Sequence, residues 1–317
     1  MISKNSKIYI AGHRGMVGSA CWRALTHVGY TNLIGKTSKE LDLKDQTSVE
    51  DFISHEKPDA VIDAAARVGG ILANDTYPYE FLMDNMLIQN NLIRSAHENN
   101  IEKFIFLGSS CIYPKHSKQP LKEEYLLTDP LEPTNEWYAI AKISGVKLIE
   151  AIRKQFGSDY VSLMPTNLYG PNDNFDLKTS HVLPAMIRKF HEAKIDNHST
   201  MTLWGSGSPL REFLHVDDLA SAVVFALENT LEEHLYNVGS GSDLTIKSLA
   251  EMVQKIVGHE AEIMWDETKP GGTPRKLLDS SKLRHKGWKS SIKLEDGIEK
   301  TYKWFLDNIL NVRELKI

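Results

Sequence analysis

Short apolar runs alternate with longer amphipathic stretches through the first half of the chain. The runs are KIYIAG (7–12), TNLIG (31–35), DAVIDAAA (59–66), KFIFLGS (103–109) and YVSLMP (160–165). Apolar residues with helical spacing occupy the stretches between them, at 16–29, 48–56, 79–100 and 138–157. Strand–helix alternation of this kind is typical of βαβ units on a parallel sheet. We therefore predict an α/β domain over residues 1–165.

The pattern becomes less regular after residue 165. Helical spacing recurs at 181–193, 216–229, 244–258 and 294–309, and short strand patterns occur at 234–239 and 261–266. MTLWGSGSPLREFL (201–214) is typical of a strand, a turn and a second strand, while 167–176 and 269–276 are rich in turn formers. Residues 166–317 are therefore predicted to form mainly a smaller α/β lobe that binds the substrate. This division leaves room for a strand or helix that returns to the first domain.

A glycine-rich loop follows the first predicted strand directly. Its spacing is GxxGxxG, and a helical pattern begins within it. Such a loop allows a tight turn and a close approach of backbone to a pyrophosphate, and the N–H groups at the helix start face the anion. The position predicts a Rossmann-like, doubly wound parallel sheet with a dinucleotide site. The predicted cofactor-binding residues of this loop are Gly12, His13, Arg14, Gly15, Met16, Val17 and Gly18.

The second strand predicts which dinucleotide is bound. An NAD site normally carries Asp or Glu near its end, to bond the ribose 2′-hydroxyl. Here the strand ends at Gly35 and no acid follows until Glu40. Arg14, Lys36, Ser38 and Lys39 can instead surround a 2′-phosphate, which favours NADP(H) over NAD. Asp42 lies where related folds bond the adenine.

Composition and charge exclude several other classes of protein. The 317 residues carry a net charge of −5, which argues against nucleic-acid binding. Two cysteines cannot build a disulfide framework, and the N-terminus has no apolar core of signal-peptide length, so we expect a cytoplasmic protein. No uncharged apolar stretch reaches the length of about 18 residues that a membrane helix needs. No metal site is predicted.

Tyr138 and Lys142 form the strongest candidate for a catalytic pair. Four residues separate them within a helical stretch, so both side chains lie on one face of that helix. A tyrosine has a reference pKa of about 10, and a neighbouring cation favours its phenolate. The pair also follows both the glycine loop and a strand that ends in Gly108-Ser109-Ser110-Cys111. This order favours a reductase.

Together these residues resemble the extended short-chain dehydrogenase/reductase family, whose Ser–Tyr–Lys triad matches Ser109, Tyr138 and Lys142. Further blocks narrow the resemblance to the GDP-L-fucose synthase family, the GDP-4-keto-6-deoxymannose 3,5-epimerase/4-reductases. They cover nearly the whole chain and read AGHRGMVGSA, AAARVGGI, LGSSCIYPK, EPTNEWYAIAK, MPTNLYGPNDNF, WGSGSPLREFLHVDD and GTPRKLLD.

The resemblance implies an enzyme that inverts C3 and C5 beside a C4 ketone and then reduces that ketone with NADPH. By resemblance Cys111 is the base and His181 the acid, while Ser109 and Tyr138 hold the ketone oxygen. A thiol has a reference pKa near 8.5, so Cys111 needs an electropositive setting. Judged from the residues alone, a buried structural cysteine and a histidine at a helix start are the commoner outcomes.

Other contacts are also implied by resemblance. The implied cofactor residues, besides the glycine loop, Lys36 and Asp42, are Leu107, Gly108, Ser109, Ser110, Lys142, Pro165, Thr166, Asn167, Leu168 and His181. The implied residues for the GDP-sugar are Asn167, Lys189, Trp204, Arg211 and Lys269. Two positions depart from the family pattern: Gly271 replaces an aspartate in the loop Lys-Pro-Asp-Gly, and Arg67 replaces a lysine. Family members are homodimers, so the helices at 78–100 and 136–157 are candidates for a four-helix bundle.

Two alternatives remain open. A sister enzyme such as a GDP-colitose synthase, which inverts only C5, carries the same motifs. A non-catalytic, NADP-sensing regulator would use the same fold, although it has no need of all five residues Ser109, Cys111, Tyr138, Lys142 and His181. Gly271 leaves the exact sugar open.

Overall fold

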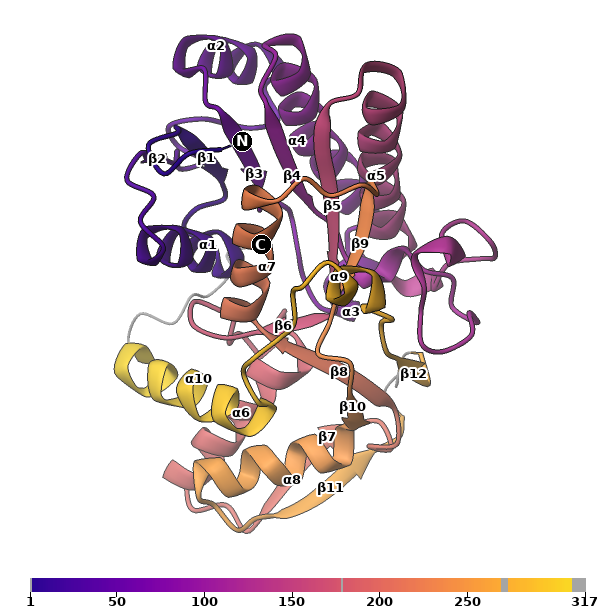
Figure 1. Ribbon diagram of the computed structural model, residues 1–317. Coiled ribbons are helices and arrows are strands. Elements are labelled where there is room, and N and C mark those ends of the chain that lie inside the picture. Colours follow the sequence, from indigo (N-terminus) through magenta and orange to yellow (C-terminus); the bar gives the residue numbers. More distant parts are fainter. Residues whose placement is uncertain (1, 178, 269–272, 310–317) are drawn as a thin grey trace.

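The computed structural model describes residues 2–177, 179–268 and 273–309 (Figure 1). Its first unit is built on a six-stranded sheet with the order β2-β1-β3-β4-β5-β9, in which every neighbouring pair is parallel. The strands are β1 (Ile8–Ala11), β2 (Leu33–Ile34), β3 (Ala60–Asp63), β4 (Lys103–Leu107), β5 (Asp159–Pro165) and β9 (Leu235–Val238). The predicted doubly wound parallel sheet is confirmed.

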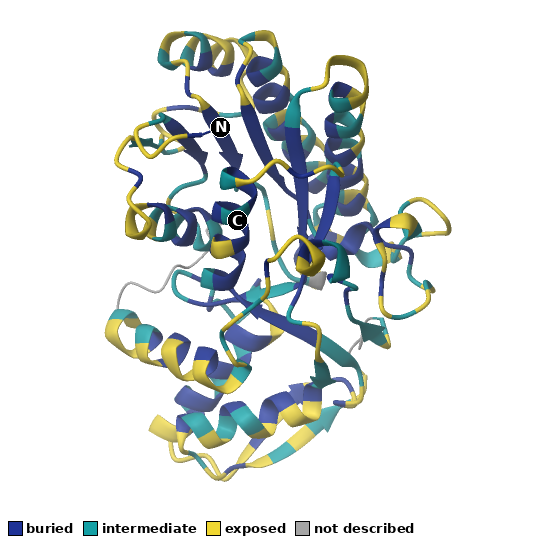
Figure 2. Ribbon diagram, viewed as in Figure 1, coloured by how far each residue is buried: buried dark blue, intermediate teal, exposed yellow. Residues whose placement is uncertain are grey.

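Helices cover both faces of this sheet, and its strands are almost wholly buried between them (Figure 2). One face carries α1 (Met16–His27) and α7 (Val216–Glu228); the other carries α2 (Gln46–Glu56), α4 (Pro78–Glu98) and α5 (Glu136–Phe156). Successive strand residues point to opposite faces. Ile8 and Ile10 therefore pack with α1 and α7, whereas Tyr9 packs in the cluster of the other three helices.

The second unit is arranged around β8 (Leu210–His215). This strand pairs with β6 (Asn167–Tyr169) and β12 (Arg275–Lys276) in parallel and with β10 (Asp243–Thr245) antiparallel. A separate parallel pair joins β7 (Thr200–Trp204) to β11 (Glu262–Asp266). Three helices share the hydrophobic cluster of this unit: α6 (Val182–Ile195), α8 (Ile246–Val257) and α10 (Leu294–Asn308).

Five short helices complete the described chain. They are α3 (Ile71–Thr76), α9 (Ser281–His285), η1 (Ser110–Ile112), η2 (Glu123–Tyr125) and η3 (Pro133–Asn135). The sequence did not predict them, because a helix of one or two turns is too short to show a hydrophobic period. None of the described helices has the length and apolar character to cross a membrane.

The strand, turn and second strand predicted over 201–214 are confirmed by β7 and β8. The two strands do not pair with each other, since β7 pairs with β11 and β8 pairs with β6, β10 and β12. The stretch 269–276, predicted as an irregular loop, ends in strand β12. Two elements beyond residue 166 complete the first unit, since α7 packs against α1 and β9 pairs with β5. The chain thus crosses between the units several times, and residues of both units, Cys111 and Lys276 among them, line one pocket.

Candidate active site

The glycine loop lies where the sheet reverses its winding direction. β1 is followed along the chain by β2 on one side and by β3 on the other. At such a switch point the loops diverge at the carboxyl ends of the strands and leave a crevice for a ligand. Gly12 has a φ of +75°, and a Cβ added there would lie 2.8 Å from the carbonyl oxygen of Ala64, which follows β3. The two loops are therefore in direct contact at the base of this crevice.

Two further glycines allow α1 to start close to β1. A Cβ on Gly18 would lie 2.2 Å from the carbonyl oxygen of Gly12, a clash with fixed backbone. Gly15 precedes the first helical residue, and no side chain caps the N–H groups of the first turn. Uncapped N–H groups at the start of a 12-residue helix are suitable donors to a phosphate. The cradle therefore fits the pyrophosphate of a dinucleotide.

The region beyond β2 is suited to a second phosphate. Glu40, the first acid after this strand, accepts hydrogen bonds from Thr37 N (2.8 Å) and Thr37 Oγ1 (2.6 Å). These bonds lower the pKa of Glu40, and the cations Lys36 and Arg14 contribute in the same direction. Asp42 similarly accepts a hydrogen bond from Lys44 N. Both carboxylates are thus engaged locally, while Arg14 and Lys36 lie close enough to Glu40 to act on it.

The carboxyl end of β4 holds the predicted serine and cysteine. Ser109 caps η1, and its Oγ accepts a hydrogen bond from Cys111 N at 3.4 Å. A Cβ on the preceding Gly108 would lie 2.0 Å from Met164 Cε, so a larger residue there would require the Met164 side chain to move. Cys111 is buried and unpaired. The end of this strand therefore fixes Ser109 and Cys111 next to each other.

Tyr138 and Lys142 lie on consecutive turns of α5, as predicted. Lys142 is buried, and its Nζ donates a hydrogen bond to the carbonyl oxygen of Leu107 at 3.0 Å. The same nitrogen lies 4.7 Å from the centroid of the Phe106 ring and 5.9 Å from that of Tyr138. Burial lowers the pKa of Lys142 and raises the pKa of Tyr138, which is raised further by Cys111 and Asp63. In this setting Tyr138 is a phenol that can donate a proton.

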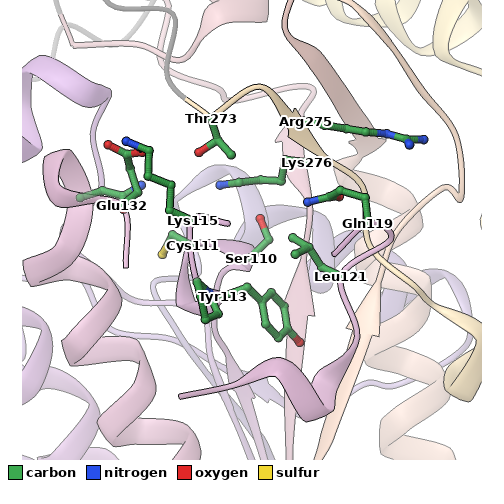
Figure 3. Close-up of a pocket in the computed structure, with 12 residues that line it drawn as sticks. Ser110, Cys111, Tyr113, Lys115, Gln119, Leu121, Glu132, Thr273, Arg275 and Lys276 are labelled. Carbon is green, nitrogen blue, oxygen red and sulfur yellow. The ribbon is translucent and has the colours of Figure 1, made fainter. Parts of the chain in front are cut away.

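A lysine that the sequence did not predict lies in the same cleft. Lys276, on β12, lines a pocket with Ser110, Cys111 and Glu132 (Figure 3). Burial raises the pKa of Cys111, and Lys276 is the strongest of the groups that lower it again. Figure 3 shows Lys276 extending toward the side where Cys111 and Glu132 lie, whereas Arg275 extends the opposite way. Lys276 therefore offsets part of the effect of burial, and the pKa of Cys111 stays above its ordinary value.

His181 is influenced by the same cation. It is the residue immediately before α6, and part of its surface is open to solvent. The surrounding protein lowers the pKa of His181, and the charge of Lys276 lowers it further. Lys276 is thus near both members of the predicted acid–base pair. It favours the thiolate of Cys111, and it makes the imidazolium of His181, the form that can donate a proton, more acidic.

The residues predicted to hold the GDP-sugar form two groups in the second unit. Lys189 Nζ lies 5.8 Å from the ring centroid of Trp204, a side chain that is 51% exposed. Arg211 lies on β8, directly opposite Lys276 in the register of β8 and β12. Lys269 and Gly271 lie outside the described residues.

The segment that joins β5 to β6 uses its polar side chains to contact β8. Thr166 Oγ1 and Asn167 Nδ2 both donate hydrogen bonds to the carbonyl oxygen of Glu212, at 3.2 and 2.8 Å. Leu168 packs in the cluster of α1 and α7. In this structure Pro165–Leu168 therefore connects the two units, and a contact with the cofactor stays a prediction.

Arg67 is one of the two positions that depart from the family pattern. It forms an ion pair with Asp84 at 3.1 Å.

Comparison with known proteins agrees with this geometry. A model of the NAD dependent epimerase/dehydratase family matches residues 8–239. The chain belongs to this family. GDP-L-fucose synthase 1 of Arabidopsis thaliana is 57% identical over 311 residues, which cover 98% of this chain and 96% of the relative. GDP-L-colitose synthase of Yersinia pseudotuberculosis is 40% identical over 95% of this chain and 98% of its own.

Solved structures of this family have the same fold. A GDP-mannoheptose C4 reductase from Campylobacter jejuni, with NADP bound, superposes with a TM-score of 0.88 at 38% identity. The superposition covers 96% of this chain and 100% of the reductase. The resemblance to the GDP-L-fucose synthases that the motifs indicated is confirmed by these comparisons.

Proposed function

We propose that this protein converts GDP-4-keto-6-deoxy-D-mannose to GDP-L-fucose by 3,5-epimerisation and NADPH-dependent reduction at C4. The observation that carries the proposal is the 57% identity to a GDP-L-fucose synthase over nearly the full length of both chains. The identity to a GDP-L-colitose synthase over a similar length is lower, at 40%. The cluster of Ser109, Cys111, Tyr138, Lys142 and His181 supports an enzyme rather than a sensing regulator.

The cofactor site fits NADP(H). The uncapped N-terminus of α1 and the glycines Gly12 and Gly18 leave room for a pyrophosphate, and Arg14 with Lys36 provides charge for a 2′-phosphate. Lys142 and the Leu107–Ser110 turn would hold the nicotinamide ribose end. When bound, NADPH supplies the hydride that C4 of the sugar accepts.

The chain's own groups carry the proton transfers. Ser109 and Tyr138 donate hydrogen bonds to the C4 oxygen, which lowers the energy of the enolate formed when a neighbouring proton leaves. At each of the two carbons, C3 and C5, the thiolate of Cys111 removes the proton and His181 returns one on the opposite face. Exchange of protons with water restores both groups before the second inversion. In the reduction Tyr138 donates its phenolic proton to the C4 oxygen, and the Lys142 ammonium stabilises the phenolate that remains.

The second unit provides the groups that suit a sugar nucleotide. Lys189 and Trp204 present a cation beside an aromatic face, an arrangement suited to a nucleotide. Arg211 and Lys276 are neighbouring cations that suit a diphosphate. We assign these four residues to the GDP portion of the substrate, with the sugar between Cys111 and His181.

One experiment tests the reaction and separates the alternatives. The protein is incubated with GDP-4-keto-6-deoxy-D-mannose and NADPH in deuterated water, and the product is identified by NMR. GDP-L-fucose with deuterium at both C3 and C5 is expected. Deuterium at C5 alone would favour an enzyme of the colitose type, and NADPH binding without turnover would favour a sensor.

We also propose a homodimer that packs α4 and α5 of each subunit into a four-helix bundle. The two helices pack together in the monomer. Large apolar side chains are nevertheless exposed along them: Tyr79, Met83, Leu87, Trp137 and Ile140. The first three recur every four residues and form one stripe on α4. Light scattering should give the mass of a dimer, and the double variant with Met83→Glu and Leu87→Glu should give the mass of a monomer.

The protein is proposed to work in the cytoplasm. Both of its cysteines are buried and unpaired, which suits a reducing compartment.

A further inference from the structure

The carboxyl end of β3 holds a buried acid that none of the proposed steps uses. Asp63 is 0% exposed and is the last residue of the strand. Its Oδ1 accepts a hydrogen bond from Ala65 N at 3.2 Å, whereas no donor reaches its Oδ2. A buried carboxylate with an unpaired oxygen is costly unless it interacts with a nearby charge. Asp63 therefore needs an explanation that packing does not give.

The strand register brings this carboxylate next to the catalytic lysine. Asp63 lies opposite Phe106 on β4, and the Phe106 ring is the one over which Lys142 Nζ lies at 4.7 Å. Lys142 uses one of its three donors on Leu107 O, at the end of the same strand. The described residues form no ion pair between Asp63 and Lys142 within 4 Å, so the two charges interact through space. In a poorly solvated interior such an interaction is strong.

Asp63 and the titratable groups near it shift one another's pKa values. Burial raises the pKa of Asp63 to about 6, and Lys142 opposes this shift. Conversely, burial lowers the pKa of Lys142, and the Asp63 carboxylate, followed by Cys111, raises it again. Asp63 also raises the pKa of Tyr138 and that of Tyr9 on β1. The carboxylate thus favours an ammonium on Lys142 and a neutral phenol on Tyr138.

We propose that Asp63 is a positioning residue for the reduction, whose buried carboxylate keeps Lys142 as the ammonium and Tyr138 as the proton-donating phenol. Both protonation states are required when Tyr138 gives its proton to the C4 oxygen and Lys142 stabilises the resulting phenolate. The inference rests on the proposed reduction and names a residue that acts through Lys142 rather than on substrate.

The test is the pH profile of NADPH oxidation by Asp63→Asn, a variant of nearly the same size. Without the carboxylate, Cys111 alone opposes the effect of burial on Lys142, so the pKa of Lys142 falls, and the pKa of Tyr138 falls as well. Both changes move the alkaline limb of kcat to lower pH, by about one unit. Below pH 6 wild-type Asp63 is itself protonated, so the two profiles should converge there. Asp59→Asn, just before the same strand, is the matched control and should leave the limb unchanged.

A second measurement needs neither substrate nor turnover. The side-chain signal of Lys142, followed by NMR of lysine-labelled protein and assigned with Lys142→Met, should titrate at lower pH in Asp63→Asn. In wild-type protein the same signal should also show an inflection near pH 6, when Asp63 loses its proton. The wild-type inflection can be measured even if the variant folds poorly. Equal Lys142 midpoints in both proteins, or no inflection in the wild type, would overturn the proposal, whereas failure to turn over the GDP-sugar would affect only the proposed function.

Discussion

The two units contribute to the cleft in different ways. In the first unit Tyr138 and Lys142 lie on a 21-residue helix, and Lys142 is held by a backbone carbonyl at the end of a buried strand. In the second unit Lys189 and Trp204 lie at the surface, and half of Trp204 is exposed. Groups that must transfer protons need fixed positions, whereas groups that bind a large ligand need access. We therefore expect changes at Tyr138 and Lys142 to lower kcat and changes at Lys189 and Trp204 to raise KM.

The largest effect is expected for Tyr138→Phe. This change removes the proton donor of the reduction and leaves the packing of the ring intact, so kcat for NADPH oxidation should fall about 10³-fold. NADPH binding, followed by fluorescence, should remain within about two-fold of wild type because the hydroxyl is not needed to hold the cofactor. Near-normal turnover by this variant would contradict the assignment of the proton donor.

Cys111→Ser should separate epimerisation from reduction. An alcohol is a far weaker base than a thiolate, so deuterium uptake at C3 and C5 should fall about 10²-fold. Reduction at C4 should be less affected, because Tyr138 and Lys142 remain. Both rates can be followed in one sample by NMR. Uptake at the wild-type rate would remove Cys111 from the role of base.

Lys276→Met tests whether the second unit also affects the chemistry. Loss of this cation should raise the pKa of Cys111 by about one unit, so the rate of alkylation by iodoacetamide at pH 8 should fall about ten-fold. Cys21 does not compete, since burial raises its pKa to about 12. Arg275→Met is the matched control, because Arg275 is paired with Asp243 at 2.6 Å. Equal alkylation rates in both variants would show that Lys276 does not affect the reactivity of Cys111.

The smallest effect is expected for Trp204→Ala. Loss of one exposed aromatic face next to Lys189 should raise KM for the GDP-sugar about five-fold and leave kcat within about two-fold of wild type. Met264→Ala removes another exposed apolar side chain, from the neighbouring strand β11, and should change neither constant. A fall in kcat for Trp204→Ala would show that the proposed division between the units is too simple.

The elements with the clearest local patterns were predicted best. The helices that became α1, α4, α5 and α8 begin and end within a few residues of the predicted stretches, because each buries one face and repeats it over three turns or more. The glycine loop and the Tyr138–Lys142 pair were found for a similar reason. Both are defined by the spacing of residues along a short piece of chain.

Residues that depend on long-range pairing were missed. Lys276 lies near Cys111 only because β12 pairs with β8, and a strand of two residues has no recognisable period. Asp63 lies within a predicted strand, but its proximity to Lys142 depends on the register between β3 and β4. A signal was present in each case: a lysine at the end of a turn-rich loop, and an acid inside an apolar run.

The order of the longer helices and main strands, the glycine loop and the placement of Tyr138 and Lys142 on one helix face could therefore be predicted from the sequence alone, because these features depend on side-chain periodicity and backbone freedom over a few residues. Three features required the folded chain: α7 and β9 complete the first unit, β7 and β8 pair with other strands, and Asp63 and Lys276 lie near Lys142 and Cys111. These contacts join residues far apart in the sequence, so they depend on how the whole chain packs its apolar side chains into a common core. The pKa of a buried group such as Asp63 or Cys111 is in turn shifted by charges that are distant in the sequence.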